Sequence, residues 1–163
     1  SHSIVPAPNS ADLQPVAQDY ITRLLNHLNY VGVLTLELFV TDKGLYANEM
    51  APRVHNSGHW SIEGAVCSQF ENHIRAVAGL PLGSTEVVRP TVMINIIGQY
   101  PQSEQVLALE GVHLHLYNKE EREGRKIGHL TLMPNDTAQL TMLCRQLAKI
   151  LPNPLALSED MTI

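Results

Sequence analysis

The sequence is poor in the features that mark nucleic-acid-binding, membrane-spanning and secreted proteins. Its 163 residues include 11 Lys and Arg against 16 Asp and Glu, for a net charge of −5, so no positive surplus is available for nucleic acid or an anionic membrane. No apolar run approaches the roughly 20 residues that a membrane-spanning helix needs, and residues 1–8 lack both parts of a signal peptide. We therefore expect a cytoplasmic protein that binds no nucleic acid and no membrane.

Cysteine and glycine-rich motifs are also scarce. The two cysteines, Cys67 and Cys144, lie far apart in the sequence and match no metal-binding or redox spacing. This favours reduced packing residues over a disulfide. The sequence contains no Gly-rich phosphate loop, and no lysine stands on an expected strand where it could bind the phosphates of ATP.

What the sequence does contain is enough apolar residues, 44%, for a buried core. Apolar positions repeat at helical spacing and predict helices at 9–29, 61–78 and 136–151. Asn9 or Ser10 could cap the first helix, Pro15 falls near its start, and Asp136 is placed to cap the third. The residues expected to face inward are Ile62, Val66, Phe70, Ile74 and Val77 in the second helix and Leu140, Leu143, Leu147 and Ile150 in the third.

Strand patterns occupy most of the remaining sequence. Short runs rich in β-branched and aromatic residues predict strands at 30–40, 44–50, 91–98, 112–118 and 126–132. The opening residues resemble an extended segment entered part way, so we expect a piece of a longer protein. Two prolines and a glycine in the stretch 80–90 predict a seam, with residues 1–84 and 85–163 as two domains of an α+β protein.

Two glutamates are expected to face each other across a hairpin. If residues 42–44 form a three-residue loop, Thr41 lies opposite Leu45, and counting back places Glu37 opposite Glu49. Facing carboxylates repel each other, so either both extend into water or a divalent cation lies between them. The apolar surroundings of Glu37 in the sequence favour the cation, and oxygen ligands without clustered Cys or His suit Mg²⁺ or Mn²⁺. Both interpretations stay open on this pattern alone.

The segment after the second glutamate is rich in groups that bind anions. Arg53, His55 and Asn56 follow Pro52 in an expected loop ahead of a helix. Arginine presents a fork of donors that suits carboxylate or phosphate, and neutral side chains and helix N-terminal amides add to it. A lone histidine here is more simply a hydrogen-bonded structural residue. An acidic strand that leads into such a loop, however, is what phosphoryl transfer from a metal-bound nucleotide requires.

These residues also resemble a known family. The paired glutamates, NEMAPRVHNSGHW at 48–60 and SQFENHIRAVAGLPL at 68–82 resemble the ATP-grasp enzymes. Joined to GRKIGH at 124–129, they resemble the 5-(carboxyamino)imidazole ribonucleotide synthases of purine biosynthesis, over nearly all of the chain up to about residue 152. The resemblance implies an α+β fold: the C-terminal part of an ATP-grasp fold, an antiparallel sheet flanked by helices, followed by a small β-rich C-terminal subdomain.

The resemblance also implies an activity and its residues. Such ligases use ATP to phosphorylate bicarbonate and pass the carboxyl group to the amine of 5-aminoimidazole ribonucleotide. Glu37 and Glu49 match the glutamates that bind Mg²⁺ (or Mn²⁺), and Asn48 stands beside Glu49 in the ATP-phosphate site. The residues that match positions meeting bicarbonate, carboxyphosphate and the ribonucleotide amine, and that we expect to be catalytic, are Arg53, His55 and Asn56.

A second group of cations lies at 118–129. Composition alone favours a solvated hairpin turn, because glutamates nearly balance the positive charges. The resemblance instead implies that Lys119, Arg125 and Lys126 bind the ribose phosphate of the substrate. Arg122 and the glutamates are interpreted as surface residues, and no role is assigned to the histidines of the neighbouring strand.

Complete members of the resembled family are longer and are commonly dimers. We therefore expect a homodimer of the complete enzyme and no ATP hydrolysis or carboxylation by this chain alone. Two alternatives stay open. Another ATP-grasp ligase, such as a formate-using purine enzyme, would keep both glutamates but should not carry RVHNSGHW together with GRKIGH. A non-catalytic binding or assembly domain would have no physical reason to keep facing carboxylates unpaired.

Overall fold

The chain forms two compact units. The computed structural model describes residues 2–8 and 10–153. One unit comprises Ala7–Val88, and the other joins the segment up to Pro6 with the segment from Arg89 onward. The division falls within the expected seam at 80–90, after Val88 rather than after residue 84. The first strand belongs with the second unit because it pairs with a strand there.

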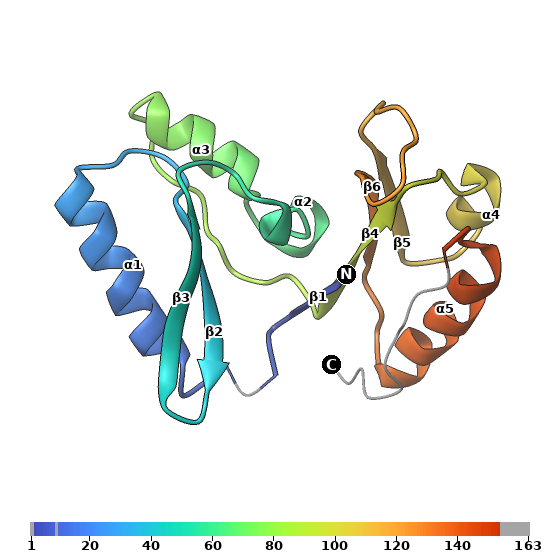
Figure 1. The fold of residues 1–163 in the computed structure, drawn as a ribbon, viewed down its shortest axis with the longest axis horizontal. Coiled ribbons are helices and arrows are strands. Elements are labelled where there is room, and N and C mark those ends of the chain that lie inside the picture. The colour runs from blue at the N-terminus through green and yellow to red at the C-terminus, as the bar shows by residue number, and fades with distance from the viewer. Residues whose placement is uncertain (1, 9, 154–163) are drawn as a thin grey trace. The chain divides into compact units, whose positions relative to one another are not determined.

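The second unit is a four-stranded antiparallel sheet with two helices (Figure 1). The strand order is β1 (His2–Val5), β4 (Thr91–Ile97), β6 (Lys126–Leu132) and β5 (Val112–Leu116). The helices are α4 (Ser103–Leu107), which the sequence pattern did not predict, and α5 (Thr137–Ile150). β4, β6 and β5 agree closely with the predicted strands, and β1 lies in the opening stretch that was expected to be extended.

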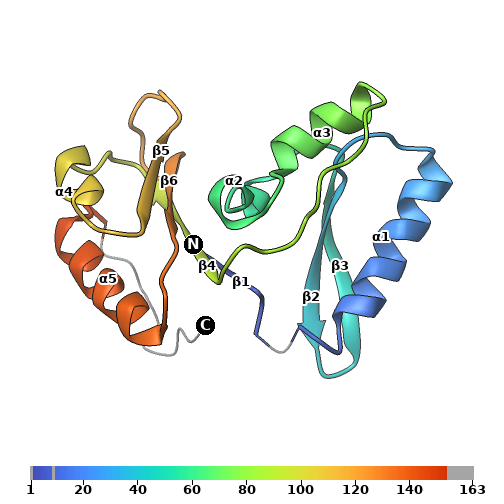
Figure 2. The same cartoon turned by 180° about the vertical axis from the view of Figure 1, so that it is seen from behind.

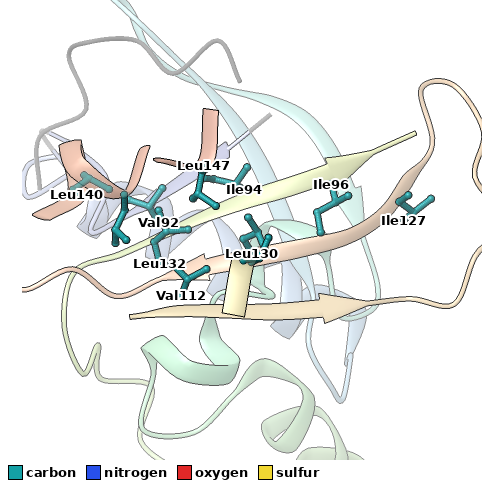
Figure 3. Close-up of a cluster of buried hydrophobic side chains, with 11 residues drawn as sticks. Val92, Ile94, Ile96, Val112, Ile127, Leu130, Leu132, Leu140 and Leu147 are labelled. Atoms are coloured by element: carbon teal, nitrogen blue, oxygen red, sulfur yellow. The ribbon is translucent and has the colours of Figure 1, made fainter. Parts of the chain in front are cut away.

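The core of this unit lies between the sheet and α5 (Figure 3). Alternate residues of β4 and β6, among them Ile94 and Leu130, are fully buried against leucines of α5. Three of the four predicted inward residues, Leu140, Leu143 and Leu147, are 0, 1 and 0% exposed, and the fourth, Ile150, is half-buried against the same core. Asp136 caps α5 as predicted, since its Oδ1 accepts a hydrogen bond from the backbone N–H of Gln139 at 2.7 Å.

The first unit is built on a two-stranded hairpin, with α1 (Gln14–Leu28) beside it (Figure 2). The strands are β2 (Thr35–Thr41) and β3 (Gly44–Ala51). The helix begins at Gln14 rather than at Asn9, because Pro15 has no N–H and is tolerated only in a first turn. A groove of about 660 Å³ lies between α1 and the hairpin, lined in part by Leu24, Leu36 and Leu38.

The second predicted helix is wrong as a single element. The structure has a 3₁₀ turn, η1 (Asn56–Gly58), then α2 (Ser61–Gly64) and α3 (Gln69–Val77). The segment between α2 and α3 is extended, and Ala65 there forms an antiparallel bridge with Val87. Ser68 then begins a new helix, because its side chain accepts a hydrogen bond from the backbone N–H of Glu71 at 3.2 Å.

Four of the five predicted inward residues of that helix are exposed, and the fifth, Phe70, is half-buried. Instead the polar side of α3 is buried: the carboxamide of Asn72 accepts from the backbone N–H of Gly83 at 2.8 Å and donates to the Gly83 carbonyl at 3.2 Å. Polar contacts therefore orient α3 within its unit. The exposed apolar residues, at 40, 62, 64 and 62%, are Ile62, Val66, Ile74 and Val77.

No helix within residues 2–8 and 10–153 combines the length and the apolar character needed to cross a membrane.

Candidate functional site

Glu37 and Glu49 face each other across the β2–β3 hairpin, as predicted, but the register arises differently. Thr41 pairs with Gly44 and Leu38 with Ala47, so the turn is one residue shorter than the expected loop. A register shift between Glu37 and Leu38 then restores the pairing of the two glutamates. The extra residue in β3 is Asn48, which makes this a β-bulge.

The bulge adds an amide to the carboxylate pair. Asn48 Nδ2 donates a hydrogen bond to Glu37 Oε2 at 3.2 Å, so all three side chains lie on one face of the hairpin. The Glu37 side chain is 35% exposed, and Asn48 and Glu49 are more open still. The face therefore presents carboxylate oxygens to solvent from both strands.

These oxygens fit a hard divalent cation that takes its remaining ligands from elsewhere. Among the residues that the structure describes, no group of three or more His, Cys, Asp or Glu side chains could hold a metal by itself. Mg²⁺ is commonly held by one or two protein carboxylates together with substrate phosphates and water. The donor set of Glu37 and Glu49 suits that kind of site.

The loop after β3 returns to the carboxylate pair. Tyr30 Oη donates to the carbonyl of Pro52 at 2.8 Å and fixes the start of the loop. His55 then places its Nδ1 at 3.5 Å from Glu37 Oε1 and at 2.9 Å from Ser57 Oγ. The structure thus brings one of the predicted catalytic residues directly against one of the predicted metal-binding residues.

The other two predicted catalytic residues belong to the same loop. Arg53 is exposed, and its Nη1 donates to the carbonyl of Val54 at 3.1 Å. Asn56 is the first residue of η1 and is half-buried. The loop therefore carries a guanidinium, an imidazole and a carboxamide within four residues, and the imidazole lies beside Glu37. Donors of this kind suit a small anion.

Gln69 contacts this loop and was missed in the sequence. Its side-chain amide bonds to the backbone of His55 and lies 2.9 Å from Nδ1 of His59. A glutamine at the start of a helix carries no signal of its own in a single sequence. Its contacts become visible only in three dimensions.

Lys119, Arg125 and Lys126 lie in the other unit, in and beside the connection between β5 and β6, and all three are exposed. Lys119 is held by two tyrosines. Its backbone N–H donates to Tyr100 Oη at 2.9 Å, Tyr100 Oη donates to its carbonyl at 2.7 Å, and its Nζ lies 5.2 Å from the centre of the Tyr117 ring. The lysine is therefore positioned although it is exposed.

Two histidines support this arrangement: His129 of the GRKIGH motif, and His115, one of the two strand histidines that received no role. His129 is 1% exposed and stacks on His115 with ring centres 4.4 Å apart. Its Nδ1 lies 2.7 Å from Tyr117 Oη, within hydrogen-bonding distance. This stack fixes the tyrosine whose ring lies under Lys119.

Comparison with known proteins connects both units to one family. Residues 1–70 match the ATP-grasp domain family, and residues 91–142 match the family of phosphoribosylaminoimidazole carboxylase C-terminal domains. The N5-carboxyaminoimidazole ribonucleotide synthase of Pseudomonas aeruginosa is 58% identical over 134 residues, which cover 82% of this chain and 37% of that protein. The Escherichia coli enzyme is 49% identical over 143 residues, 88% of this chain and 40% of that protein.

Solved structures agree with these relatives. The crystal structure of the Thermus thermophilus N5-carboxyaminoimidazole ribonucleotide synthetase has a TM-score of 0.87 at 50% identity, covering 92% of this chain and 42% of that one. The Aspergillus clavatus synthase in complex with ADP and 5-aminoimidazole ribonucleotide has a TM-score of 0.79 at 32% identity, covering 90% and 42%.

The chain spans about 40% of the length of the curated relatives that it matches. Its α+β architecture is that of the ATP-grasp C-terminal part followed by the carboxylase C-terminal domain. With sequence identity and fold in agreement over both units, this chain belongs to the N5-carboxyaminoimidazole ribonucleotide synthase family and corresponds to the C-terminal portion of its members.

Proposed function

We propose that this chain contributes to the ATP-dependent carboxylation of 5-aminoimidazole ribonucleotide by bicarbonate, giving N5-carboxyaminoimidazole ribonucleotide, ADP and phosphate in purine biosynthesis. The observation that carries the proposal is the facing pair of Glu37 and Glu49 with His55 3.5 Å from Glu37. Relatives named as synthases of this product, one of them in complex with ADP and the ribonucleotide, support it.

The hairpin face serves the nucleotide phosphates in this proposal. Glu37 and Glu49 would hold Mg²⁺ (or Mn²⁺), which when bound supplies positive charge to the phosphate oxygens of ATP. Asn48 restrains Glu37 through its 3.2 Å hydrogen bond, and it stands with Glu49 at the ATP phosphates.

The loop of residues 53–59, here called the bicarbonate loop, binds the small anion. A bicarbonate oxygen attacks the γ-phosphorus of ATP, the bond to ADP breaks, and carboxyphosphate forms. Arg53 offsets the negative charge of this intermediate, while His55 and Asn56 orient it. Closing such a pocket to water protects the short-lived anion and strengthens its electrostatic stabilisation.

The second step requires the ribonucleotide. Its amine nitrogen attacks the carboxyl carbon of carboxyphosphate, phosphate leaves with the electrons of the broken C–O bond, and the nitrogen loses a proton. Lys119, Arg125 and Lys126 bind the ribose phosphate. Tyr100 fixes the backbone of Lys119, and the Tyr117 ring near Nζ reduces the freedom that this long side chain would otherwise lose on binding.

In this proposal Glu37, Glu49 and the bicarbonate loop act on the metal and bicarbonate, and Lys119, Arg125 and Lys126 act on the phosphate of the ribonucleotide. We place the complete enzyme in the cytoplasm as a homodimer. Sedimentation equilibrium of the complete enzyme would give twice the subunit mass, and a monomer at micromolar concentration would contradict the dimer.

A hybrid enzyme tests the function. The aligned C-terminal portion of the Pseudomonas aeruginosa synthase is replaced by the corresponding residues of this chain, which share 58% identity with it. The hybrid should form ADP only when bicarbonate and 5-aminoimidazole ribonucleotide are both present, and the 163-residue chain alone should form none. A folded but inactive hybrid beside an active parent would refute the assignment, as would ADP formation by the chain alone.

Two variants of the hybrid separate chemistry from folding. Arg53→Lys keeps the positive charge but loses the fork of donors, so activity should fall by about tenfold or more because a bidentate contact is lost. Glu120→Gln changes an exposed glutamate next to Lys119 that has no proposed role, and its activity should match that of the unmodified hybrid.

A further inference from the structure

The carboxamide of Gln69 bonds to both backbone polar groups of His55. Its Oε1 accepts from the His55 N–H at 3.0 Å, and its Nε2 donates to the His55 carbonyl at 2.7 Å. His55 is extended, with φ −127° and ψ 150°. The side-chain amide therefore pairs with this residue as a backbone amide of an adjacent antiparallel strand would.

The first residue of α3 also fastens the loop through its backbone. The Gln69 N–H donates to Ser61 Oγ at 3.0 Å, and the Ser61 hydroxyl donates to the carbonyl of Gly58 at 2.6 Å. The Gln69 side chain additionally lies 2.9 Å from Nδ1 of His59. Gln69 thus contacts His55 within the bicarbonate loop, His59 at its end, and Ser61 in the helix that follows.

Gly58 makes room for this side chain. A Cβ atom at position 58 would lie 2.6 Å from Gln69 Oε1 and 2.8 Å from its Cδ. Contacts that short do not occur, so any larger residue at 58 must displace the carboxamide. The loop is therefore closed around the glutamine side chain.

We propose that Gln69 is a positioning residue for carboxylation: it holds the backbone of His55 so that the imidazole stays beside Glu37 and the bicarbonate loop keeps the shape that receives the anion. The expected effect on catalysis rests on the proposed function. The restraint of His55 by Gln69 does not depend on that function. Phosphoryl transfer depends mainly on positioning, and a misplacement of about 1 Å can lower a rate by about a hundredfold.

The first test compares two amides on the same helix. Gln69→Met keeps the length of the side chain and removes its hydrogen bonds. Asn72→Leu is the matched control, because Asn72 pairs in the same way with the backbone of Gly83, away from the bicarbonate loop. Two quantities are measured: hydrogen exchange of the His55 amide in the chain, by nuclear magnetic resonance, and kcat and KM in the hybrid enzyme.

Gln69→Met should speed exchange of the His55 amide by about fivefold, the effect of one net hydrogen bond, and should lower kcat by about a hundredfold with little change in KM for ATP. Asn72→Leu should lower the melting temperature but leave His55 exchange and kcat near wild type. Unchanged His55 exchange in Gln69→Met would overturn the proposal, and so would an equal loss of kcat in Asn72→Leu.

A double-mutant cycle tests the contact between Gly58 and the Gln69 side chain. Gly58→Ala should speed His55 exchange and lower kcat because it displaces Gln69. In a Gln69→Ala background there is no carboxamide to displace, so Gly58→Ala should add almost nothing. Additive effects would show that Gly58 and Gln69 act independently. If the unmodified hybrid is inactive, the proposed function fails, while the exchange rates still decide whether Gln69 restrains His55.

Discussion

Replacing Glu49 by Gln should stabilise the chain when no divalent cation is present. Glu37 and Glu49 pair directly across β2 and β3, where opposing side chains lie about 5 Å apart. Two unit charges at that separation repel by about 0.8 kcal/mol in water. For a chain of 163 residues, a change of this size raises the melting temperature by about 2–4 °C.

Glu49 is the better partner to replace. Glu37 accepts a hydrogen bond from Asn48 and lies 3.5 Å from the imidazole of His55. A substitution at Glu37 would therefore remove favourable contacts together with the repulsion, and the two effects would offset each other. Glu49 is exposed, so Glu49→Gln changes mainly the charge.

Thermal unfolding followed by circular dichroism gives the measurement. The increase in melting temperature caused by Glu49→Gln should appear at low ionic strength. It should vanish in 1 M salt, where the screening length is about 3 Å. Magnesium should raise the melting temperature of the wild type but not of the variant, because a ligand stabilises only the state that binds it. Glu120→Gln makes the same change in net charge and serves as control. A Glu49→Gln protein that melts at or below the wild type in low salt without magnesium would refute the reasoning.

Three further predictions concern the second unit. Leu143→Ala should lower the unfolding free energy by about 2–5 kcal/mol in denaturant titrations, since Leu143 is 1% exposed. The control Met142→Ala, at a 49% exposed position, should change that free energy by about 0.5 kcal/mol or less. Equal effects of the two substitutions would contradict the assigned core. Asp136→Ala should lower the free energy of unfolding by about 1 kcal/mol because the cap on α5 is lost. Asp136→Asn should keep most of that stability, because asparagine can also cap a helix. Burial raises the pKa of the Cys144 thiol, so Cys144 in a Cys67→Ser background should react with a thiol reagent at pH 8 more slowly than after denaturation, and an equal rate would be inconsistent with that shift.

Apart from the short helix α4, the elements of the second unit could be predicted because local signals and burial agree there. In α5, the capping aspartate, the leucine spacing and the sheet opposite all favour the same helix. The runs rich in β-branched residues at 91–98 and 126–132 form the paired central strands of the sheet. In such segments, tertiary packing reinforces the sequence preference.

The region from 61 to 78 could not be predicted in this way. Its apolar residues recur at helical spacing, but backbone hydrogen bonds from Val66 to Glu86 and from Val88 to Gly64 hold part of it extended. Ser68 then acts as a cap rather than as an interior helix residue. The partners lie about 20 residues further along the chain, and periodicity within one window contains no information about them.

The candidate site was predicted in part by compensating errors. The count that placed Glu37 opposite Glu49 assumed a loop one residue too long and an unbroken ladder, and the bulge at Asn48 cancels the difference. The contact of His55 with Glu37 and the restraint by Gln69 depend on the return of the loop. Side-chain chemistry identified the participants, but the geometry between them required the fold.

The bulge at Asn48 adds a side chain to the hairpin without changing which residues face each other. Ala47 pairs with Leu38 and Glu49 with Glu37 on either side of the unpaired Asn48. Because side chains alternate between faces with a period of two, a variant that lacks Asn48 would make Ala47 and Glu49 neighbours in an unbroken ladder and would keep Glu49 opposite Glu37. Such a variant should lose only the amide that donates to Glu37, so the bulge serves to bring a third polar side chain to a pair of carboxylates that the turn already aligns.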